Sequence, residues 1–313
     1  MIDLIKQSKV ISIVGMGKNV GKTTTLNYLI SSLPSTKIGL TSIGYDGEDI
    51  DTITNKPKPK ITVLENTIFA TATTLLKHTQ LDFDILVETK MNTPLGEVVL
   101  VRAKSSGNVI LAGPSMKSQI KEIIDLFWGY NVEKIFIDGA FGKMVSTDAS
   151  LVDATILATG LAYHPNIDKI VNDTIYRAHL YQNENLYKVQ DEEVLIISDV
   201  IGNELEKAKQ IDSKMTNRLN GALTDRFINE ILYNSSKRNL KFILDNPTMC
   251  FVSNEVAQKA LLRNINIYFA NTTKLLAITI NPTSPHGLVI DSNLLKEKLA
   301  SKTNIPVFDV MKE

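Results

Sequence analysis

The stretch Gly15-Met16-Gly17-Lys18-Asn19-Val20-Gly21-Lys22-Thr23-Thr24 is the most informative part of this chain. It follows an apolar run at residues 10–14 and precedes a helix-like stretch at residues 25–30. Glycines in such a turn let several backbone N–H groups converge on one group of phosphate oxygens. The helix that follows adds the positive end of its dipole. The pattern is typical of a strand, a phosphate-binding loop and a helix.

The residues of this loop supply what a nucleoside triphosphate with magnesium requires. Lys22 brings a positive charge to the β- and γ-phosphates, and the Thr23 hydroxyl is a ligand for magnesium. We therefore predict ATP, the default nucleotide, and Mg²⁺ as cofactors, with Lys22 acting in catalysis. Lys18 has two interpretations, a contact with a phosphate or a side chain in solvent. The residues predicted to bind the nucleotide are Gly17, Lys18, Asn19, Val20, Gly21, Lys22, Thr23 and Thr24.

The loop departs from the usual P-loop pattern at one position. That pattern places four residues between its first glycine and the Gly-Lys pair. Here Met16 stands where this glycine belongs, and Gly15 lies one residue earlier. We expect a loop one residue longer than usual. The alternative is a chance glycine-rich turn between a strand and a helix.

Length and composition narrow the classes of function. The chain has 313 residues, which suits two domains, and 43% of them are apolar. Basic and acidic residues number 34 each, so the formal net charge is zero and no nucleic-acid surface is expected. The single cysteine, Cys250, excludes an intramolecular disulfide and a thiolate zinc cluster. We expect this thiol to be a small buried apolar group rather than a nucleophile.

Membrane association is not expected from the sequence. No apolar run approaches the roughly 20 residues that span a bilayer. Residues 1–6 are too few and too charged to be a signal peptide. We therefore expect a cytoplasmic protein.

The first half of the chain alternates short apolar strands with helical patterns, which is typical of a mainly parallel α/β sheet. We assign residues 1–165 to a P-loop nucleotide-binding domain. A helix is expected from Ser115, with an apolar face over residues 120–127. Strands are expected at residues 37–43, 61–63, 84–88, 98–102, 109–112 and 134–138.

Beyond about residue 165 the alternation weakens. We assign residues 166–313 to a second, smaller α/β domain that carries partner contacts. Strands are expected at residues 194–197, 241–244, 266–269, 275–280 and 307–310, and helices at residues 224–232, 255–262 and 293–300.

Two carboxylates are candidates for the metal and the chemistry. Asp138 ends an apolar strand, where a carboxylate can hold the magnesium that offsets phosphate charge. The alternative for Asp138 is a residue that caps the following turn. Asp46 follows the strand at 37–43, at the edge where ligands gather in a doubly wound sheet. It is a candidate both for metal binding and for orienting an attacking water, and the alternative is a solvated acidic loop.

Three weaker candidates stay open. Glu88 ends an expected strand, but a structural pairing with Lys90 explains it equally well. Lys143 has the same two interpretations as Lys18. The segment Asn281–Pro285 either contacts a base or a partner or is simply a turn.

Two parts of the chain resemble dethiobiotin synthetase and related amide-forming P-loop enzymes. Those enzymes also have a longer loop, often with a valine before Gly-Lys-Thr, as Val20 is here. The stretch Ile137-Asp138-Gly139-Ala140 is similar to their strand end, where the acidic residue holds magnesium. The resemblance covers roughly the first 165 residues and implies these roles for Lys22, Thr23 and Asp138. Their substrate lysine after the second strand is replaced here by residues 42–46, so dethiobiotin formation is unsupported.

A resemblance over the whole chain points to a second family. Residues 15–24, 41–48, 92–99, 111–115 and 278–285 look like stretches of the P-loop component of the reactivating pair for lysine 5,6-aminomutase. Such reactivases are thought to use ATP to exchange damaged cobalamin on the mutase for intact cofactor. The resemblance implies two partners, the cobalamin-dependent aminomutase and a second reactivase subunit.

The leading hypothesis from the sequence is a magnesium-dependent ATPase that remodels a partner protein. A small-molecule kinase or ligase of the dethiobiotin-synthetase type is the alternative, with a pocket lined by the loop at 94–97 and Arg102. A third hypothesis is a nucleotide-binding structural protein without useful hydrolysis, because the loop lacks the usual first glycine.

Overall fold

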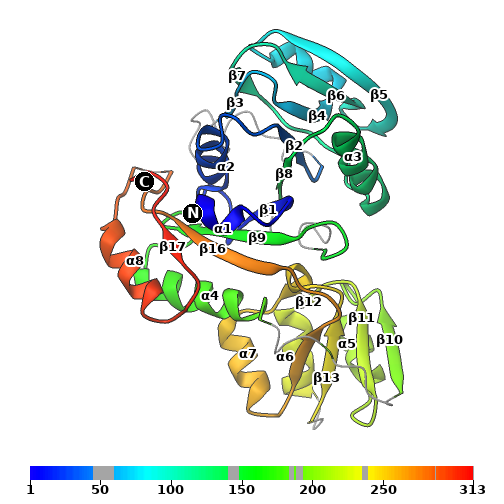
Figure 1. Ribbon diagram of the computed structural model, residues 1–313. Helices are drawn as coiled ribbons and strands as arrows, with labels where there is room; N and C mark the ends of the chain where they lie inside the picture. The colour runs from blue at the N-terminus through cyan, green and yellow to red at the C-terminus, as the bar shows by residue number, and fades with distance from the viewer. Residues whose placement is uncertain are drawn as a thin grey trace.

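The computed structural model describes residues 1–44, 60–139, 148–182, 187, 193–234, 239–285 and 287–312. Two parallel-stranded sheets organise these residues, one of nine strands and one of four (Figure 1). Within the described residues, no helix is both long and apolar enough to cross a membrane.

The nine-stranded sheet has the order β17-β16-β9-β1-β8-β2-β4-β6-β5. The strands pair in parallel from β17 to β4, and the pairs β4–β6 and β5–β6 are antiparallel. The sheet is therefore mainly parallel, as predicted. Its strands are β1 (Val10–Gly15), β2 (Ile38–Ser42), β4 (Ile68–Ala72), β5 (Phe83–Thr93), β6 (Gly96–Ala103), β8 (Lys134–Asp138), β9 (Ala154–Gly160), β16 (Lys274–Asn281) and β17 (Val307–Phe308).

Helices cover both faces of the large sheet, because successive side chains of a strand point to opposite faces. In β8, Phe136 packs in the same cluster as the apolar residues of α1 (Ile2–Ile5) and α2 (Lys22–Ser31). Its neighbours Ile135 and Ile137 pack with α3 (Lys117–Gly129) on the other face. On strands β16 and β17, α4 (Ile167–His179) and α8 (Ser292–Ala300) form a further cluster.

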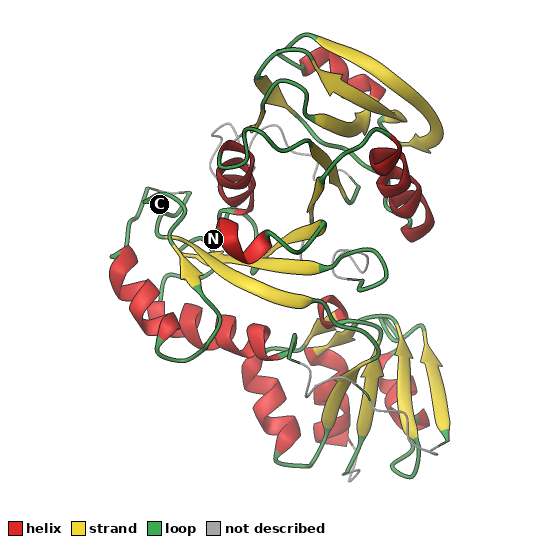
Figure 2. Cartoon of the chain, viewed as in Figure 1, coloured by secondary structure: helices red, strands yellow, loops and turns green. Residues whose placement is uncertain are grey.

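The second sheet has the order β10-β11-β13-β15, and all of its pairs are parallel. Helices lie beside this sheet (Figure 2). One apolar cluster joins the sheet to these helices. The strands are β10 (Val194–Ser198), β11 (Thr216–Asn220), β13 (Lys241–Leu244) and β15 (Asn266–Phe269); the helices are α5 (Glu204–Gln210), α6 (Asp225–Asn234) and α7 (Asn254–Leu261).

Short elements complete the described structure. An antiparallel pair, β3 (Ile61–Val63) and β7 (Gly107–Val109), lies beside α2. A parallel pair, β12 (Leu223–Thr224) and β14 (Cys250–Phe251), flanks the second sheet. The 3₁₀ helices are η1 (Thr73–His78) and η3 (Pro247–Met249).

The sheets do not divide the chain at residue 165. Strands β16 and β17 and helix α8 belong to the large sheet, although the predicted boundary placed them in the C-terminal unit. The physical reason lies in β9, whose residues are all buried. One edge of β9 pairs with β1, and the backbone groups of its other edge need a partner, which β16 supplies. The smaller α/β unit thus spans only the strands from β10 to β15.

Candidate functional site

The segment between β1 and α2, residues 16–21, is called the glycine-rich loop below. It follows the carboxyl end of β1, which lies between β8 and β9 in the sheet (Figure 1). Ligands of parallel α/β sheets collect at this edge of the strands. The loop therefore lies where the sequence pattern predicts a phosphate site.

At two positions, just before the loop and at its end, a side chain would meet steric hindrance. A Cβ atom on Gly15 would lie 2.7 Å from Cγ2 of Val20, so only glycine fits at residue 15 without a shift of its neighbours. Gly21 has a φ of 97°, in the left-handed region, and a Cβ there would lie 3.0 Å from Cβ of Asn281.

Met16 stands where the usual pattern places a glycine, and it has a different structural role. Its N–H donates to the carbonyl of Ala158 at 2.9 Å, which continues the pairing of β1 with β9. Its side chain is buried with Val14 and Leu157. The close approach that needs a glycine has thus moved to Gly15, and this explains the departure from the pattern.

The first turn of α2 contains Lys22, Thr23 and Thr24, all partly exposed. Gly21 occupies the N-cap position and has no side chain to cap the first N–H groups. The Lys22 ammonium donates to the carbonyl of Gly17 at 3.4 Å, so the side chain folds back over the glycine-rich loop. Uncapped N–H groups, a helix start and an ammonium group together suit a phosphate.

The other predicted loop residues differ in exposure. Lys18 is exposed and Gly17 half-buried. Asn19 adopts a φ of 60°, a left-handed conformation that asparagine tolerates better than most residues. Val20 is buried, so its part in any nucleotide contact is limited to its backbone. These four residues directly precede the turn that carries Lys22 and Thr23.

Asp138 ends β8, directly beside the strand that carries the loop. Asp138 pairs with Ile13 of β1, and the N–H of Gly139 donates to the Ile13 carbonyl at 3.0 Å. On the other side Asp138 pairs with Ser42 of β2. The carboxylate is half-buried, at the same edge of the sheet as Thr23. One carboxylate and one hydroxyl suit Mg²⁺, which keeps several waters and takes phosphate oxygens as further ligands.

No group of three or more His, Cys, Asp or Glu side chains that could hold a metal occurs among the residues the structure describes. Within the described residues, a metal at Asp138 and Thr23 would have one carboxylate and one hydroxyl as protein ligands. This donor set fits a magnesium ion that arrives with a nucleotide better than a resident metal.

Asn281 has a larger part than its position in a predicted turn suggested. Its side-chain amide donates to the carbonyl of Asn19 at 3.3 Å, and its Oδ1 accepts from the N–H of Thr283 at 3.1 Å. Its own carbonyl accepts from the N–H of Leu161 at 3.0 Å, and a Cβ on Gly160 would lie 2.0 Å from that oxygen. Asn281 thus connects the glycine-rich loop with the chain segments that follow β9 and β16. The sequence signal was an Asn-Pro pair at a strand end, which is typical of ordinary turns as well.

Several predicted residues do not join this site. Glu88 lies in β5 and Arg102 in β6, and β8, β2 and β4 all stand between β6 and β1. Glu97 accepts a hydrogen bond from the N–H of Lys90 at 2.6 Å within the β5–β6 hairpin. Asp46 and Lys143 lie outside the described residues.

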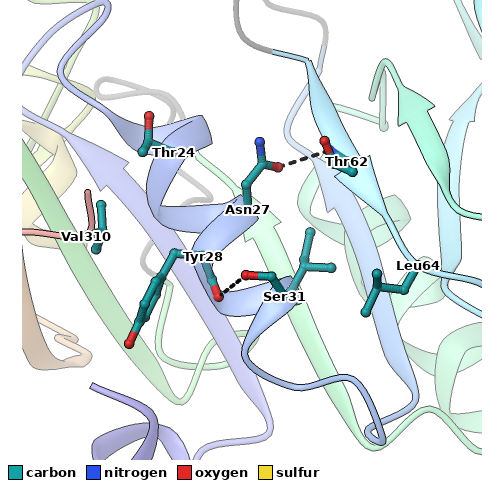
Figure 3. A pocket seen from close by; sticks show the side chains of 8 residues that line it. Thr24, Asn27, Tyr28, Ser31, Thr62, Leu64 and Val310 are labelled. Carbon is teal, nitrogen blue, oxygen red and sulfur yellow. Dashed lines mark hydrogen bonds between the residues drawn. The ribbon is translucent and has the colours of Figure 1, made fainter. Parts of the chain in front are cut away.

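An open depression of about 400 Å³ lies along α2, beside β3 and the end of the chain (Figure 3). Asn27 borders it and binds the neighbouring strand, because its Oδ1 accepts from the N–H of Thr62 at 3.0 Å. Of the predicted nucleotide-binding residues, Thr24 alone belongs to the lining, and no charged side chain is among the lining residues that the structure describes. The depression is therefore unsuited to phosphate. Its lining residues are Thr24, Asn27, Tyr28, Ile30, Ser31, Thr62, Leu64 and Val310.

Comparisons with protein-family models, with curated proteins and with solved structures returned no match.

Proposed function

We propose that this chain binds ATP with Mg²⁺ at the glycine-rich loop and hydrolyses it to remodel a partner protein. One observation carries the proposal, the position of the loop between β1 and α2 with Asp138 on the neighbouring strand. Uncapped N–H groups at a helix start and the charge of Lys22 favour a polyphosphate over a neutral ligand. The carboxyl edge of a parallel sheet is also where such ligands bind.

Each group has a distinct part in this proposal. Lys22 would offset charge on the β- and γ-phosphates, and Thr23 with Asp138 would hold the magnesium ion, which would supply further positive charge there. Asp46 is proposed to orient the attacking water. Positioning and charge stabilisation supply most of the catalysis in phosphoryl transfer, so few reactive side chains are needed.

The proposed partner is a cobalamin-dependent aminomutase, lysine 5,6-aminomutase, acting with a second reactivase subunit. The support is the resemblance of residues 15–24, 41–48 and 92–99 to reactivase sequences. Turnover is expected to be slow for the isolated chain and to rise with the partner, since a partner can complete a phosphoryl-transfer site in trans. The product of the cycle is a mutase that has exchanged damaged cobalamin for intact cofactor.

The test is phosphate release from Mg-ATP by the purified chain, measured alone, with the second subunit, and with mutase that carries inactivated cobalamin. Stimulated release together with recovered mutase activity is the expected result. Equal turnover with and without the mutase and the second subunit would count against remodelling. ADP release that requires a small acid or amine instead would identify the small-molecule ligase alternative, although the position of Arg102 in β6 does not support its expected pocket.

A further inference from the structure

Tyr163 lies beside the entry to the glycine-rich loop, on the chain segment that follows β9. Its N–H donates to the carbonyl of Gly160 at 2.9 Å, which closes a tight turn. Its ring packs against the buried apolar cluster that contains Met16, and its Cδ2 is 3.7 Å from the place a Cβ on Gly17 would occupy. The ring therefore lies beside the first two residues of the loop.

The tyrosine hydroxyl is held from the far side by helix α4. It donates to Oδ2 of Asp173 at 2.8 Å, and Asp173 is 9% exposed. The same oxygen accepts from Nζ of Lys169 at 2.9 Å. The negative charge of Asp173 is thus shared between a phenol and an ammonium group, and the phenol is fixed at one end. Burial and this hydrogen bond raise the pKa of Tyr163 to about 12, so the hydroxyl remains a donor at neutral pH.

Packing alone does not account for this arrangement. Apolar packing beside Met16 requires only an aromatic ring. Tyr163 is half-buried, and its hydroxyl also donates a hydrogen bond to the buried carboxylate of Asp173. The consequence is a ring whose position is set at both ends, by Asp173 on α4 and by the turn after Gly160. A ring held in this position limits how far residues 16 and 17 can move.

We propose that Tyr163 is a positioning residue for the glycine-rich loop, holding Met16 and Gly17 in the arrangement that receives the phosphates. The proposal rests on the proposed nucleotide function and adds to it. The ring acts on the loop and makes no contact with the base. Its removal must therefore weaken every polyphosphate ligand alike.

The test compares the affinities of two probes, Mg-ATP and Mg-tripolyphosphate, measured by calorimetric titration of the full chain. Tyr163→Ala is expected to weaken both probes by the same factor, about tenfold, because a displaced loop misplaces its donors. Tyr163→Phe keeps the ring and is expected to stay within about threefold of the parent, since one hydrogen bond is lost. Tyr233→Ala, which removes a tyrosine that is 74% exposed on α6, is the matched control. Tyr163→Leu replaces the alanine variant if the latter fails to fold.

Each outcome separates this inference from the function on which it rests. Failure of the parent protein to bind either probe would overturn the nucleotide function itself. Binding of both probes by the parent and by Tyr163→Ala with equal affinity would overturn the positioning role alone. A loss confined to Mg-ATP would also overturn it, because the ring would then contact the base. A purely structural part for Tyr163 would lower thermal stability and leave both affinities of the folded protein unchanged.

Discussion

The side-chain amide of Asn281 donates a hydrogen bond to the backbone carbonyl of Asn19 across 3.3 Å, although 262 residues separate them in the chain. This bond ties the glycine-rich loop to the end of β16. Gly21 lies against the same asparagine, because a Cβ atom added to Gly21 would be 3.0 Å from Cβ of Asn281. The candidate nucleotide site is therefore built from both ends of the sequence.

Gly21→Ala tests the close contact with Asn281. The substitution forces a left-handed conformation on an L residue, which costs about 1–2 kcal/mol, and adds crowding against Asn281. Gly202→Ala is the matched control, because Gly202 has a φ of 85° and nothing within 4 Å of a new Cβ. Urea unfolding should show a larger loss of stability for Gly21→Ala than for Gly202→Ala. Equal losses would mean that the contact with Asn281 relaxes without cost.

Lys22→Ala tests the ammonium group over the loop. Removing a charge-assisted contact of about 1.5–3 kcal/mol should weaken Mg-ATP binding by roughly tenfold to a hundredfold. Lys121→Ala, an exposed lysine on α3, should leave the affinity unchanged. The measurement is a fluorescent-nucleotide titration. Unchanged affinity in the Lys22 variant would remove this residue from the site.

Asp138→Asn separates metal binding from nucleotide binding. The amide is nearly isosteric but carries no charge for magnesium, so ATP should still bind while phosphate release is lost. Asp125→Asn on α3 serves as the control, since Asp125 is exposed. Phosphate release is measured over a range of magnesium concentrations. Turnover at the parent rate would show that Asp138 only caps its turn.

Tyr163 should be visible in an alkaline titration. Its pKa is raised to about 12, first by burial and then by the hydrogen bond to Asp173. A raised pKa means that the folded state favours the neutral phenol, so this group stabilises the fold fully below pH 10. That stabilisation is lost as pH rises from 10 through about 12. The absorbance of ionised tyrosine, followed as pH rises, should therefore show one fewer tyrosine titrating near pH 12 in Tyr163→Phe than in the parent protein. A variant whose curve loses a tyrosine titrating near pH 10 would contradict the assignment.

A truncated chain of residues 1–165 tests the division of the molecule. We expect the fragment to aggregate or to unfold readily, because it lacks β16. The edge of β9 that pairs with β16 in the full chain would then be unpaired and exposed. Helix α4 and the buried residues Ile278, Ile280 and Leu295 are also removed, so the whole apolar cluster that α4 and α8 form on β16 and β17 is lost. Size-exclusion chromatography and circular dichroism of the fragment and the full chain give the comparison. A stable, monomeric fragment would restore the boundary predicted from sequence.

Local patterns predicted many elements well. The strands Lys134–Asp138, Lys241–Leu244 and Asn266–Phe269 match the prediction residue for residue. The helix expected from Ser115 begins instead at Lys117, with Met116 at the N-cap and no capping side chain. Helix ends depend on a few backbone bonds, so a serine nearby is a weak signal.

The elements that the sequence patterns missed include the strands β4, β9 and β11 and the helices α1, α4 and α5. Strand β9 reads Ala-Thr-Ile-Leu-Ala-Thr-Gly and is buried on both faces, so it lacks the strict alternation of apolar and polar residues that marks a half-buried strand. Helix α4 was within reach of sequence reasoning, because Asn166 caps it through the N–H of Lys169 and its apolar residues repeat at helical spacing.

The sequence by itself determined the α/β class, the glycine-rich loop with Lys22 and Thr23 after it, and the carboxylate at the end of β8. These features are local, since strand, turn and helix are encoded by neighbouring residues. Tertiary structure alone decided that β16 returns to the first sheet and that Asn281 and Tyr163 lie against the loop. Those relations depend on which strand edges pair. A hydrogen bond between residues 262 positions apart leaves no periodic trace in a single sequence.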